Sequence, residues 1–243
     1  MTQEEIWKNH IKNITVDDII KGYRNPAIFQ KELVELIDQE YKNNSKIIEV
    51  GCELGVTSLL LSNKFNKSLL DLNPLAIELT KKAHIKLDKK ANFIIADMFD
   101  MPFENNEFDV VFNAGVIEHF NEEERTNAFK EYSRILTNDG VMFIAFPNHY
   151  TFPYRFAYKI RKLLKKWPYP DEYKIFDLKN EINNSNLVLE ERLVISKESL
   201  MNWLDFRPLR YKFFAPVKWL FQFIDIFYNF EGYLTVLKIR KKN

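Results

Sequence analysis

The sequence predicts an α/β fold built on a doubly wound, mostly parallel sheet of seven strands. Two observations lead to this prediction. Short β-branched or apolar runs alternate with helix-like segments along the chain, which is the pattern of a parallel sheet. The runs are also almost continuously apolar, as expected of strands that helices cover on both faces. At 243 residues the chain has the length of one such domain with added cap elements.

Seven segments are predicted as strands, and each is a short run rich in β-branched and other apolar residues. The last two lie near the C-terminus and are expected to close the sheet. In chain order the segments are KIIEV (46–50), SLLDL (68–72), NFIIA (92–96), FDVVF (108–112), VMFIAF (141–146), LVLEERLVI (187–195) and YLTVLKIR (233–240).

Two of the intervening helices have recognisable N-terminal signals. Asn73 before Pro74 predicts a capping residue followed by a first-turn proline, and Asn121 with Glu124 predicts a cap with an acidic first turn. The second of these helices is expected to end at a turn over residues 138–140. Its apolar positions fall at helical spacing and should pack on the sheet: Ala128, Phe129, Tyr132, Ile135 and Leu136.

The remaining segments are predicted to cover the core. Residues 1–45 look helical and are expected to form an N-terminal cap on a core that spans residues 46–243. Two insertions, at about 148–174 and 196–232, are also expected to be cap material. The second insertion is too long to be a hairpin turn between its flanking strands.

Composition excludes several classes of protein. The net charge is only +1, from 35 Lys and Arg against 34 Asp and Glu, so no nucleic-acid partner is expected. The single cysteine, Cys52, excludes an internal disulfide framework. The polar N-terminus matches no secretory signal and no run of about 18 uncharged apolar residues occurs, so we expect a cytoplasmic protein without a transmembrane span. The four histidines are scattered and predict no metal site.

The loop after the first predicted strand has the features of a nucleotide site. Gly51 and Gly55 allow a sharp turn and the close approach of a ligand at this edge of the sheet. A phosphate-binding loop would need lysine after the last glycine, where the chain has Val56. A dinucleotide fingerprint would need glycine at position 53, and Glu53 would repel a pyrophosphate. S-adenosylmethionine (SAM) has no phosphate and carries a sulfonium and an ammonium, so Glu53 favours that cofactor.

Two further carboxylates strengthen the nucleoside interpretation. Asp71 ends the second strand 20 residues after Gly51, where it can accept hydrogen bonds from both ribose hydroxyls. Capping of the helix that opens at Pro74 is its alternative role. Glu49 lies inside an otherwise apolar strand, where an unpaired carboxylate is costly, so contact with the ammonium of the ligand is expected.

Five motifs follow one another along the chain: EVGCELG (49–55), LLDLNPLAIELTKKA (69–83), ADMFDMPFENNEFDVVF (96–112), NAGVIEHF (113–120) and RILTNDGVMFIAFPN (134–148). With them the chain resembles the class I SAM-dependent methyltransferases, in particular the group that acts on small molecules. The resemblance runs from about residue 45 to residue 147. It implies a Rossmann-like methyltransferase fold and SAM as the cofactor. The departure is Glu53, where the family pattern has glycine.

The resemblance assigns cofactor contacts to nine residues. In that family the acidic residue ending the first strand and the glycines surround the methionine part, and the end of the second strand holds the ribose. Residues after the third strand contact the adenine, and residues after the fourth line the floor. The matching positions are Glu49, Gly51 and Gly55, then Asp71 with Leu72, then Asp97 with Met98, and finally Asn113 with Ala114.

The catalytic candidates are Glu118 and His119, which follow the fourth strand. Methyl transfer is an in-line displacement that depends mainly on positioning, and a general base is needed only if the acceptor loses a proton. His119 titrates in the useful range and can take a proton from a hydroxyl acceptor, with a purely structural role as the alternative. Glu118 is equally suited to organising the loop.

The stretch at 147–170 is expected to cover the acceptor pocket, or alternatively to seat its aromatic side chains on the cap. Its cations flank an apolar stripe through Ile160, Leu163, Leu164 and Trp167. This pattern predicts a solvated helix face, or a face that contacts an acidic substrate or a membrane surface. The apolar segment 216–230 leaves a similar choice among a cap helix, a lipid-like substrate, a membrane interface and a dimer contact. The candidate substrate contacts are His149, Tyr150, Tyr154 and Arg155.

Three functional hypotheses follow. The leading one is SAM-dependent methyl transfer to a small-molecule acceptor, aromatic or amphiphilic. The second is a methyltransferase-like protein that binds a ligand or partner without catalysis, motivated by Glu53 and by the absence of a compelling base. The third, an NAD-linked oxidoreductase, is weak because the dinucleotide fingerprint is incomplete.

Overall fold

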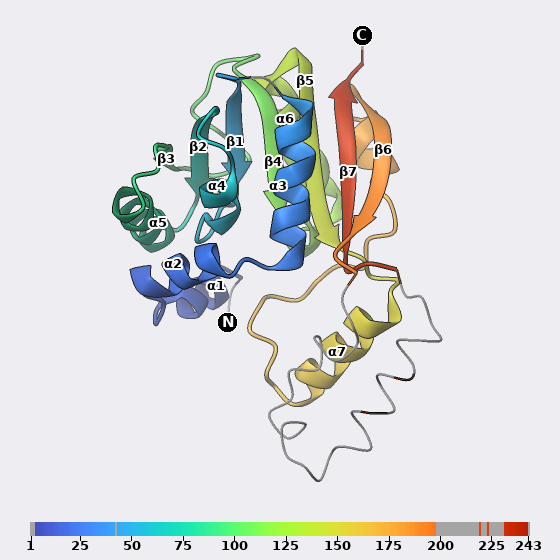
Figure 1. The fold of residues 1–243 in the computed structure, drawn as a ribbon. Coiled ribbons are helices and arrows are strands. Elements are labelled where there is room, and N and C mark those ends of the chain that lie inside the picture. Colours follow the sequence, from blue (N-terminus) through green and yellow to red (C-terminus); the bar gives the residue numbers. More distant parts are fainter. Residues whose placement is uncertain (1–2, 42, 198–218, 220–222, 224–230, 243) are drawn as a thin grey trace.

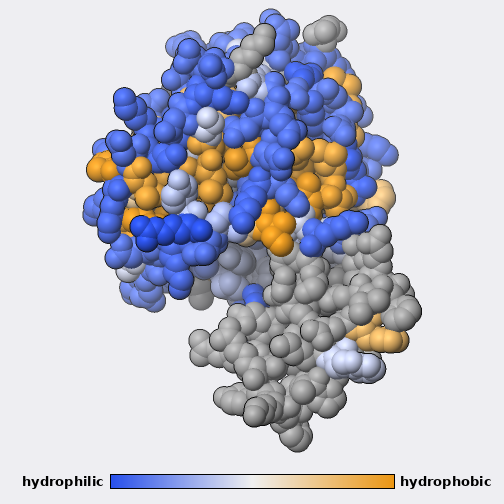
Figure 2. All heavy atoms as spheres, viewed as in Figure 1, coloured by the Kyte–Doolittle hydropathy of each residue, from blue (hydrophilic) through white to orange (hydrophobic). Residues whose placement is uncertain are grey.

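The computed structural model describes residues 3–41, 43–197, 219, 223 and 231–242 (Figure 1). Most of the apolar segment 216–230 and of the insertion predicted at 196–232 therefore lies outside the described residues. On the side of the molecule drawn in Figure 2, hydrophilic residues cover most of the described surface and apolar residues form a band across its middle. Within the described residues, no helix is both long enough and apolar enough to cross a bilayer.

The sheet has seven strands, as the sequence predicted. They are β1 (Lys46–Val50), β2 (Asn66–Asp71), β3 (Asn92–Ile95), β4 (Phe108–Ala114), β5 (Leu136–Pro147), β6 (Leu187–Ile195) and β7 (Leu234–Lys241). Their order is β3-β2-β1-β4-β5-β7-β6, with β1 to β5 parallel and β7 antiparallel to both of its neighbours. The direction of strand addition reverses between β1 and β4, and ligands bind at such a switch point in open α/β sheets.

Helices cover both faces of the sheet (Figure 1). They are α1 (Gln3–Ile11), α2 (Val16–Arg24), α3 (Ile28–Glu40), α4 (Val56–Leu60), α5 (Pro74–Lys86), the 3₁₀ helix η1 (Ile117–His119), α6 (Glu122–Ile135), α7 (Phe152–Leu163) and α8 (Lys179–Asn183). Tyr132 of α6 packs with Ile48 in one core cluster, whereas Ile37 of α3 packs with Ile47 in another. Neighbouring strand residues point to opposite faces, so the two clusters are the two sides of the sheet. The α3 helix, within the segment 1–45 that the sequence predicts as a cap on the core, therefore packs directly on the sheet.

The two predicted helix starts are confirmed. The side chain of Asn73 accepts a hydrogen bond from the Leu75 N–H at 3.0 Å at the start of α5. At the start of α6, Asn121 and Glu124 each accept from the other's backbone N–H, at 3.0 and 2.8 Å, and so form a capping box.

The turn predicted at residues 138–140 is wrong. These residues lie inside β5, which begins directly after α6. Phe108 of β4 pairs with Leu136, and Val110 pairs with Val141, so the register shifts across this stretch. The polar residues form an irregularity within the strand, which the sequence pattern of a turn does not distinguish from a true chain reversal.

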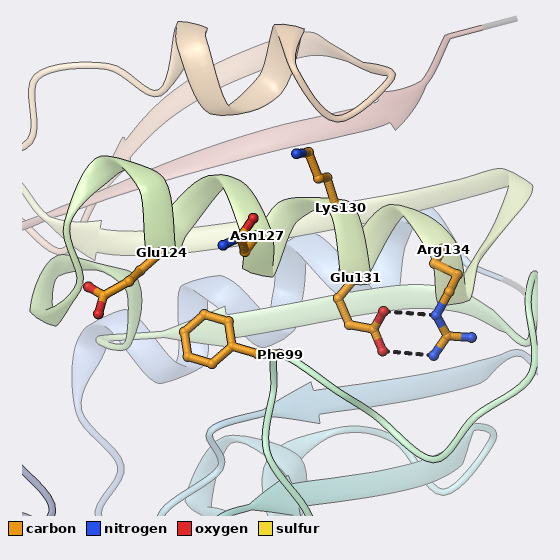
Figure 3. Close-up of a pocket in the computed structure, with 6 residues that line it drawn as sticks. All are labelled: Phe99, Glu124, Asn127, Lys130, Glu131 and Arg134. Atoms are coloured by element: carbon orange, nitrogen blue, oxygen red, sulfur yellow. Dashed lines mark hydrogen bonds and ion pairs between the residues drawn. The ribbon is translucent and has the colours of Figure 1, made fainter.

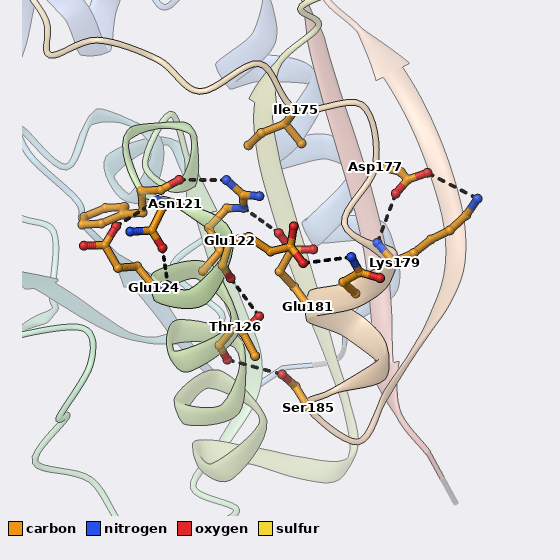
Figure 4. A network of polar contacts seen from close by, with 12 residues as sticks. Asn121, Glu122, Glu124, Thr126, Ile175, Asp177, Lys179, Glu181 and Ser185 are labelled. Carbon is orange, nitrogen blue, oxygen red and sulfur yellow. Dashed lines mark hydrogen bonds and ion pairs between the residues drawn. The ribbon is translucent and has the colours of Figure 1, made fainter.

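A buried ion pair ties α8 to α6. The Nε of Arg125 donates to Oε1 of Glu181 at 2.6 Å, and only 10% and 3% of the two side chains are exposed. Figure 4 shows the same contact region, where the Ser185 hydroxyl donates to the carbonyl of Thr126 at 3.4 Å. These contacts fix the segment that leads into β6 against the helix covering this face of the sheet.

Candidate functional site

A cavity of about 620 Å³ lies at the carboxyl ends of β1, β2 and β4. Nine residues predicted from the sequence line it: Glu49, Gly51, Gly55, Asp71, Leu72, Asp97, Met98, Ala114 and His119. The other six predicted site residues are not among the described residues that line it: Asn113, Glu118, His149, Tyr150, Tyr154 and Arg155. The strand ends thus bring together most of the predicted cofactor contacts and separate them from the predicted acceptor contacts.

Glu49 presents a buried carboxyl group to this cavity and is only 5% exposed. The backbone N–H and the hydroxyl of Ser58 in α4 both donate to its Oε2, at 3.2 and 2.5 Å. Burial raises the pKa of Glu49 to about 7, an effect that the Ser58 bonds oppose and that neighbouring Asp71 and Glu53 reinforce. A cation entering the cavity would favour the ionised form of this group.

Lys67 holds the end of α4 that carries Ser58. Its ammonium, 3% exposed, donates to the carbonyls of Ser58 and Leu61 at 3.4 and 3.2 Å. These carbonyls belong to the C-terminal end of α4, where a cation is favourable. Burial lowers the pKa of Lys67 to about 8. No sequence pattern indicates this role, because a lysine at the start of a strand is typical of a surface residue.

Asp71 is held in place by two backbone amides. The Glu53 N–H donates to its Oδ2 at 2.8 Å and the Asn73 N–H donates to its Oδ1 at 2.9 Å. Each carboxylate oxygen can accept a further bond, so both remain able to receive a hydroxyl from the cavity. Burial raises the pKa of Asp71 above its ordinary value, against the effect of these amides. The carboxylate that the sequence predicted for the ribose is therefore fixed in orientation and lies on the cavity wall.

Glu53 points toward the N-terminal helix. Its Oε1 lies 3.2 Å from Nε2 of His10 in α1. The backbone of Glu53 has a φ of 46°, in the left-handed region where glycine is favoured. The chain therefore keeps the backbone conformation of a glycine at this position and adds a carboxylate that reaches toward α1.

The two glycines of the loop are required by packing within the chain. A Cβ on Gly51 would lie 2.8 Å from Cγ2 of Val116, and one on Gly55 would lie 2.5 Å from Cγ2 of Thr80. Both also have positive φ, of 71° and 61°. The sequence predicts that these glycines allow a ligand to approach closely. In the structure they also allow the loop to pack against α5 and the segment after β4.

The adenine candidates have unequal surroundings. Asp97 is exposed and its Oδ1 accepts from the Phe99 N–H at 3.0 Å, whereas Met98 is 8% exposed and faces the cavity. Asn113 lies behind Met98: its amide donates to the Tyr132 hydroxyl at 3.2 Å, and that hydroxyl donates to the Met98 sulfur at 3.3 Å. Asn113 therefore supports a cavity residue, while Ala114 lines the cavity itself.

The α1 helix forms part of the cavity wall, which the sequence did not indicate. Gln3 and Trp7 line the cavity, and the Gln3 amide donates to the His119 carbonyl at 3.3 Å. The Trp7 ring meets the His119 ring edge-on, with centroids 5.4 Å apart, and lies 5.7 Å from Tyr169. The segment QEEIWKNHI carries no binding motif, and its role depends on where the tertiary fold places it.

His119 is a neutral ring at the cavity. Burial lowers its pKa below the ordinary value. Its Nδ1 lies 3.3 Å from the Asp171 carbonyl, which can only accept, so Nδ1 carries the proton. Nε2 is then the nitrogen with a free lone pair, and it can accept a proton.

Glu118 lies next to His119 but is sealed from the cavity. It is 2% exposed, and its Oε2 is buried without a hydrogen-bond partner among the described residues. Burial, with a contribution from Glu172, raises the pKa of Glu118 to about 8. The group is therefore protonated at neutral pH.

Two of the predicted substrate contacts are parts of a buried network. The Ile175 N–H donates to Nδ1 of His149, so the proton of this ring is on Nε2, which lies 3.0 Å from Oε2 of Glu172. The Tyr154 hydroxyl donates to the other oxygen of Glu172. His149 and Tyr154 are each 1% exposed. Both fasten α7 and the 164–178 loop to the core.

The other two predicted substrate contacts lie outside this network. Tyr150 is 50% exposed, with the Lys174 ammonium 4.3 Å from its ring centre. Arg155 lies over the ring of Tyr158, 4.6 Å from its centre. No metal-binding group of three or more His, Cys, Asp or Glu side chains occurs in the part of the chain that the structure describes.

A second hollow, of about 660 Å³, lies on the outer side of α6 (Figure 3). Glu131 and Arg134 form a two-pronged ion pair there, with N–O distances of 2.7 and 2.8 Å. Arg134 also donates to the carbonyls of Met101 and Phe103, at 3.0 and 2.7 Å. These polar groups are satisfied by one another, so they secure the loop after β3 to α6.

Residues 47–140 match the sequence family described as a methyltransferase domain. Tocopherol O-methyltransferase of Arabidopsis thaliana is 24% identical over 156 residues, covering 58% of this chain and 44% of that protein. A 2-methyl-6-phytyl-1,4-hydroquinone methyltransferase of Oryza sativa is 29% identical over 160 residues, covering 62% of this chain and 45% of that protein. The chain thus spans less than half the length of these two relatives.

The fold is also that of solved methyltransferase structures. A structure of geranyl diphosphate methyltransferase in complex with SAM matches with a TM-score of 0.63 and 14% identity, covering 93% of this chain and 90% of that one. At this identity the likeness establishes the architecture of the sheet and its helices.

Proposed function

We propose, from the premise that residues 47–140 belong to the methyltransferase domain family, that the protein transfers a methyl group from SAM to a small-molecule acceptor of aromatic or amphiphilic character. The single observation that carries the proposal is Asp71, a carboxylate oriented by two backbone amides on the wall of the cavity. Such a group suits a pair of ribose hydroxyls, because each of its oxygens keeps a lone pair for one of them.

The charges around the cavity suit SAM in particular. Glu49, Glu53 and Asp71 gather at one end of it, and their mutual repulsion contributes to the raised pKa of Glu49. SAM supplies a methyl group on a sulfonium and also carries an ammonium, so its positive charges would relieve that repulsion. Met98 and Ala114 offer apolar contacts on the adenine side.

Much of the remaining lining of the cavity is apolar and aromatic. Trp7, Ile11, Phe29, Val116 and Phe120 contribute to it. This lining supports an acceptor with an aromatic or aliphatic body, whose burial is favourable. Nε2 of His119 would accept the proton of a hydroxyl acceptor, and the Asp171 carbonyl would hold the other ring nitrogen in the required tautomer.

Calorimetric titration with SAM tests the cofactor site. The wild type should bind, and Asp71→Ala should bind about 100-fold more weakly, because two charge-assisted hydrogen bonds are lost. Asp100→Ala is the matched control, since Asp100 is exposed and lies outside the cavity lining, and it should bind as the wild type does. An unaltered heat on Asp71→Ala would contradict the ribose assignment.

Transfer of a labelled methyl group from SAM to a panel of aromatic and amphiphilic alcohols, phenols and amines tests the reaction. Turnover of any of them separates an enzyme from a protein that only binds. For a hydroxyl acceptor, His119→Gln should lower the rate and abolish the part of the pH–rate profile that reports a base in the free enzyme. A pH–rate profile unchanged in His119→Gln would exclude His119 as the base.

A further inference from the structure

The outer side of α7 carries exposed apolar residues. The inner side of the helix is packed, with Tyr154, Ala157 and Tyr158 only 1%, 3% and 7% exposed. On the other side, Leu163 is 79% exposed, and Leu164, which follows the helix, is 41% exposed. The two leucines of the stripe that the sequence predicts therefore lie outside the packed face of the helix, whereas Trp167 packs against Tyr158.

The same surface concentrates positive charge. Residues 151–170 contain six of the 35 Lys and Arg residues and none of the 34 Asp and Glu residues, in a chain whose net charge is +1. Lys159, Lys162, Lys165 and Lys166 are all exposed. Lys162 pairs with Asp171 at 2.6 Å. The other three form no ion pair with an acidic residue in the part of the chain that the structure describes.

One of these lysines occupies a position that favours glycine. Lys165 has a φ of 52°, and its N–H donates to the Lys162 carbonyl at 2.9 Å. The Lys166 N–H donates to the Arg161 carbonyl at 2.8 Å, which completes a Schellman motif at the end of α7. Glycine is usual at the left-handed residue of this motif, because a side chain is unfavourable there. The backbone thus holds the Lys165 side chain at an exposed position just beyond α7, where its charge is also favourable at the negative end of the helix.

We propose that the outer end of α7, formed by Lys159, Leu163, Leu164, Lys165 and Lys166, docks on an anionic lipid bilayer. Leucines flanked by lysines match the two layers of such a surface, because apolar side chains enter the acyl boundary and ammonium groups pair with anionic headgroups. A soluble polyanion would engage the lysines and leave the leucines in water, so the exposed leucines favour lipid. The inference rests on this surface and holds whichever acceptor is methylated.

Co-sedimentation of the full chain with vesicles tests the proposal. Vesicles of phosphatidylcholine with about 30% phosphatidylglycerol should bind the protein at least about tenfold more tightly than phosphatidylcholine alone, and high salt should weaken the binding. Lys165→Glu combined with Lys166→Glu should weaken it by about tenfold or more. Leu163→Ser should weaken binding by about threefold at every salt concentration, because its contribution is apolar.

Two control variants separate docking from general effects. Lys81→Glu combined with Lys90→Glu makes the same change in net charge at exposed lysines on and just after α5, and it should leave vesicle binding within about twofold of the wild type. Lys165→Gly should weaken vesicle binding while raising the melting temperature, so loss of fold cannot account for the loss of binding.

Equal binding to neutral and anionic vesicles would overturn the proposal, as would an equal loss in the α5 control pair. Binding to heparin without binding to anionic vesicles would also overturn it, and would assign the surface to a soluble polyanion.

Discussion

Glu49 and Glu118 are buried carboxyl groups near the carboxyl ends of two neighbouring strands, β1 and β4, yet their surroundings differ. Glu49 lies in β1, receives two hydrogen bonds from Ser58 and lines the cavity. Glu118 lies in η1 after β4, has an oxygen without a hydrogen-bond partner among the described residues, and is sealed behind the cavity wall beside the Glu172 network. Burial raises both pKa values, to about 7 for Glu49 and about 8 for Glu118.

Exposure to the cavity therefore divides this edge of the sheet into an open half, which contains Glu49, and a sealed half, which contains Glu118. A cation can reach Glu49 and stabilise its ionised form, whereas Glu118 can lower its electrostatic cost only by keeping its proton. The open half is therefore organised for a positively charged ligand. The sealed half, with His149, Tyr154 and Glu172, is organised to hold α7 and its following loop in place.

The largest effect is expected from Glu172→Ala in the sealed half. The substitution leaves His149 and Tyr154 without their shared acceptor, and Glu172 itself is only 3% exposed. The loss of two buried hydrogen bonds to a shared carboxylate should lower the free energy of unfolding by about 3 kcal/mol, measured by urea denaturation. The SAM affinity of the folded protein should change by less than about threefold, since the open half is not altered.

The neighbouring Asp171 supplies the matched control for this change. Its side chain is 79% exposed and forms a surface ion pair with Lys162, so Asp171→Ala should change the free energy of unfolding by less than about 1 kcal/mol. Equal losses in the two variants would show that the buried network has no special contribution. A large loss of SAM affinity in Glu172→Ala would show that the two halves are coupled.

Residues 46–146 were predictable because their physical signals are local. Continuous apolar runs mark strands buried on both faces, and strand ends in a parallel sheet must meet at one edge, so Glu49 and Asp71 are predicted at a common site. The resemblance to the methyltransferases adds Ala114 to that site. The same logic failed at β5, because a polar stretch can be accommodated as an irregularity within a strand. The apolar spacing of α3 predicts an amphipathic helix but does not show whether its apolar face packs on the sheet or on other cap elements, since both environments require the same spacing.

The remainder of the site depends on contacts between residues distant in the sequence. Trp7 joins the cavity through the tertiary placement of α1, more than 100 residues from His119. His149 and Tyr154 are residue types that often contact substrates. In the fold, however, both side chains are buried and hydrogen-bonded to Glu172. Residue type predicts what a side chain can do, whereas burial and partner decide which of these roles is available.

The pH dependence of Glu49→Gln and Glu118→Gln should sharpen the comparison. For Glu49 the folded pKa of about 7 lies above the ordinary glutamate value of 4.5, so the folded state loses stability as pH rises between these values. Glutamine cannot ionise, and Glu49→Gln should therefore raise the free energy of unfolding at pH 8 by up to about 3 kcal/mol, with little change below pH 4. Glu118→Gln should also stabilise the protein, with the gain continuing to grow up to about pH 8.

Ligand binding should distinguish the two glutamine variants. The affinity of the wild type for SAM should rise with pH through about 7, as Glu49 ionises. Glu49→Gln should abolish this rise and weaken binding at pH 8, whereas Glu118→Gln should leave both the rise and the affinity in place. Denaturation and calorimetry at matched pH values measure the two quantities. A parallel loss of affinity in both variants would contradict the division into an open and a sealed half.

The smallest effect concerns Glu53, the third carboxylate of the open half. Glu53→Gly removes a side chain from a left-handed residue, which should raise the free energy of unfolding by up to about 1 kcal/mol, and removes the contact with His10, which should lower it by less. Asp88→Gly is the matched control, because Asp88 is exposed and has a similar φ of 51° at the end of α5.

The free energy of unfolding should therefore rise more in Asp88→Gly than in Glu53→Gly. This difference between the two variants should disappear when both are made in a His10→Ala background. A difference that survives in that background would mean that His10 is not what stabilises the Glu53 side chain. SAM titration of Glu53→Gly then tests whether this carboxylate attracts the ligand or only contacts His10 of α1. One result would show that Glu53 has both roles: SAM affinity falls about threefold or more in Glu53→Gly, and the smaller stability gain of this variant disappears in the His10→Ala background. The Glu53 carboxylate would then hold α1 to the cofactor loop and also attract the positively charged ligand.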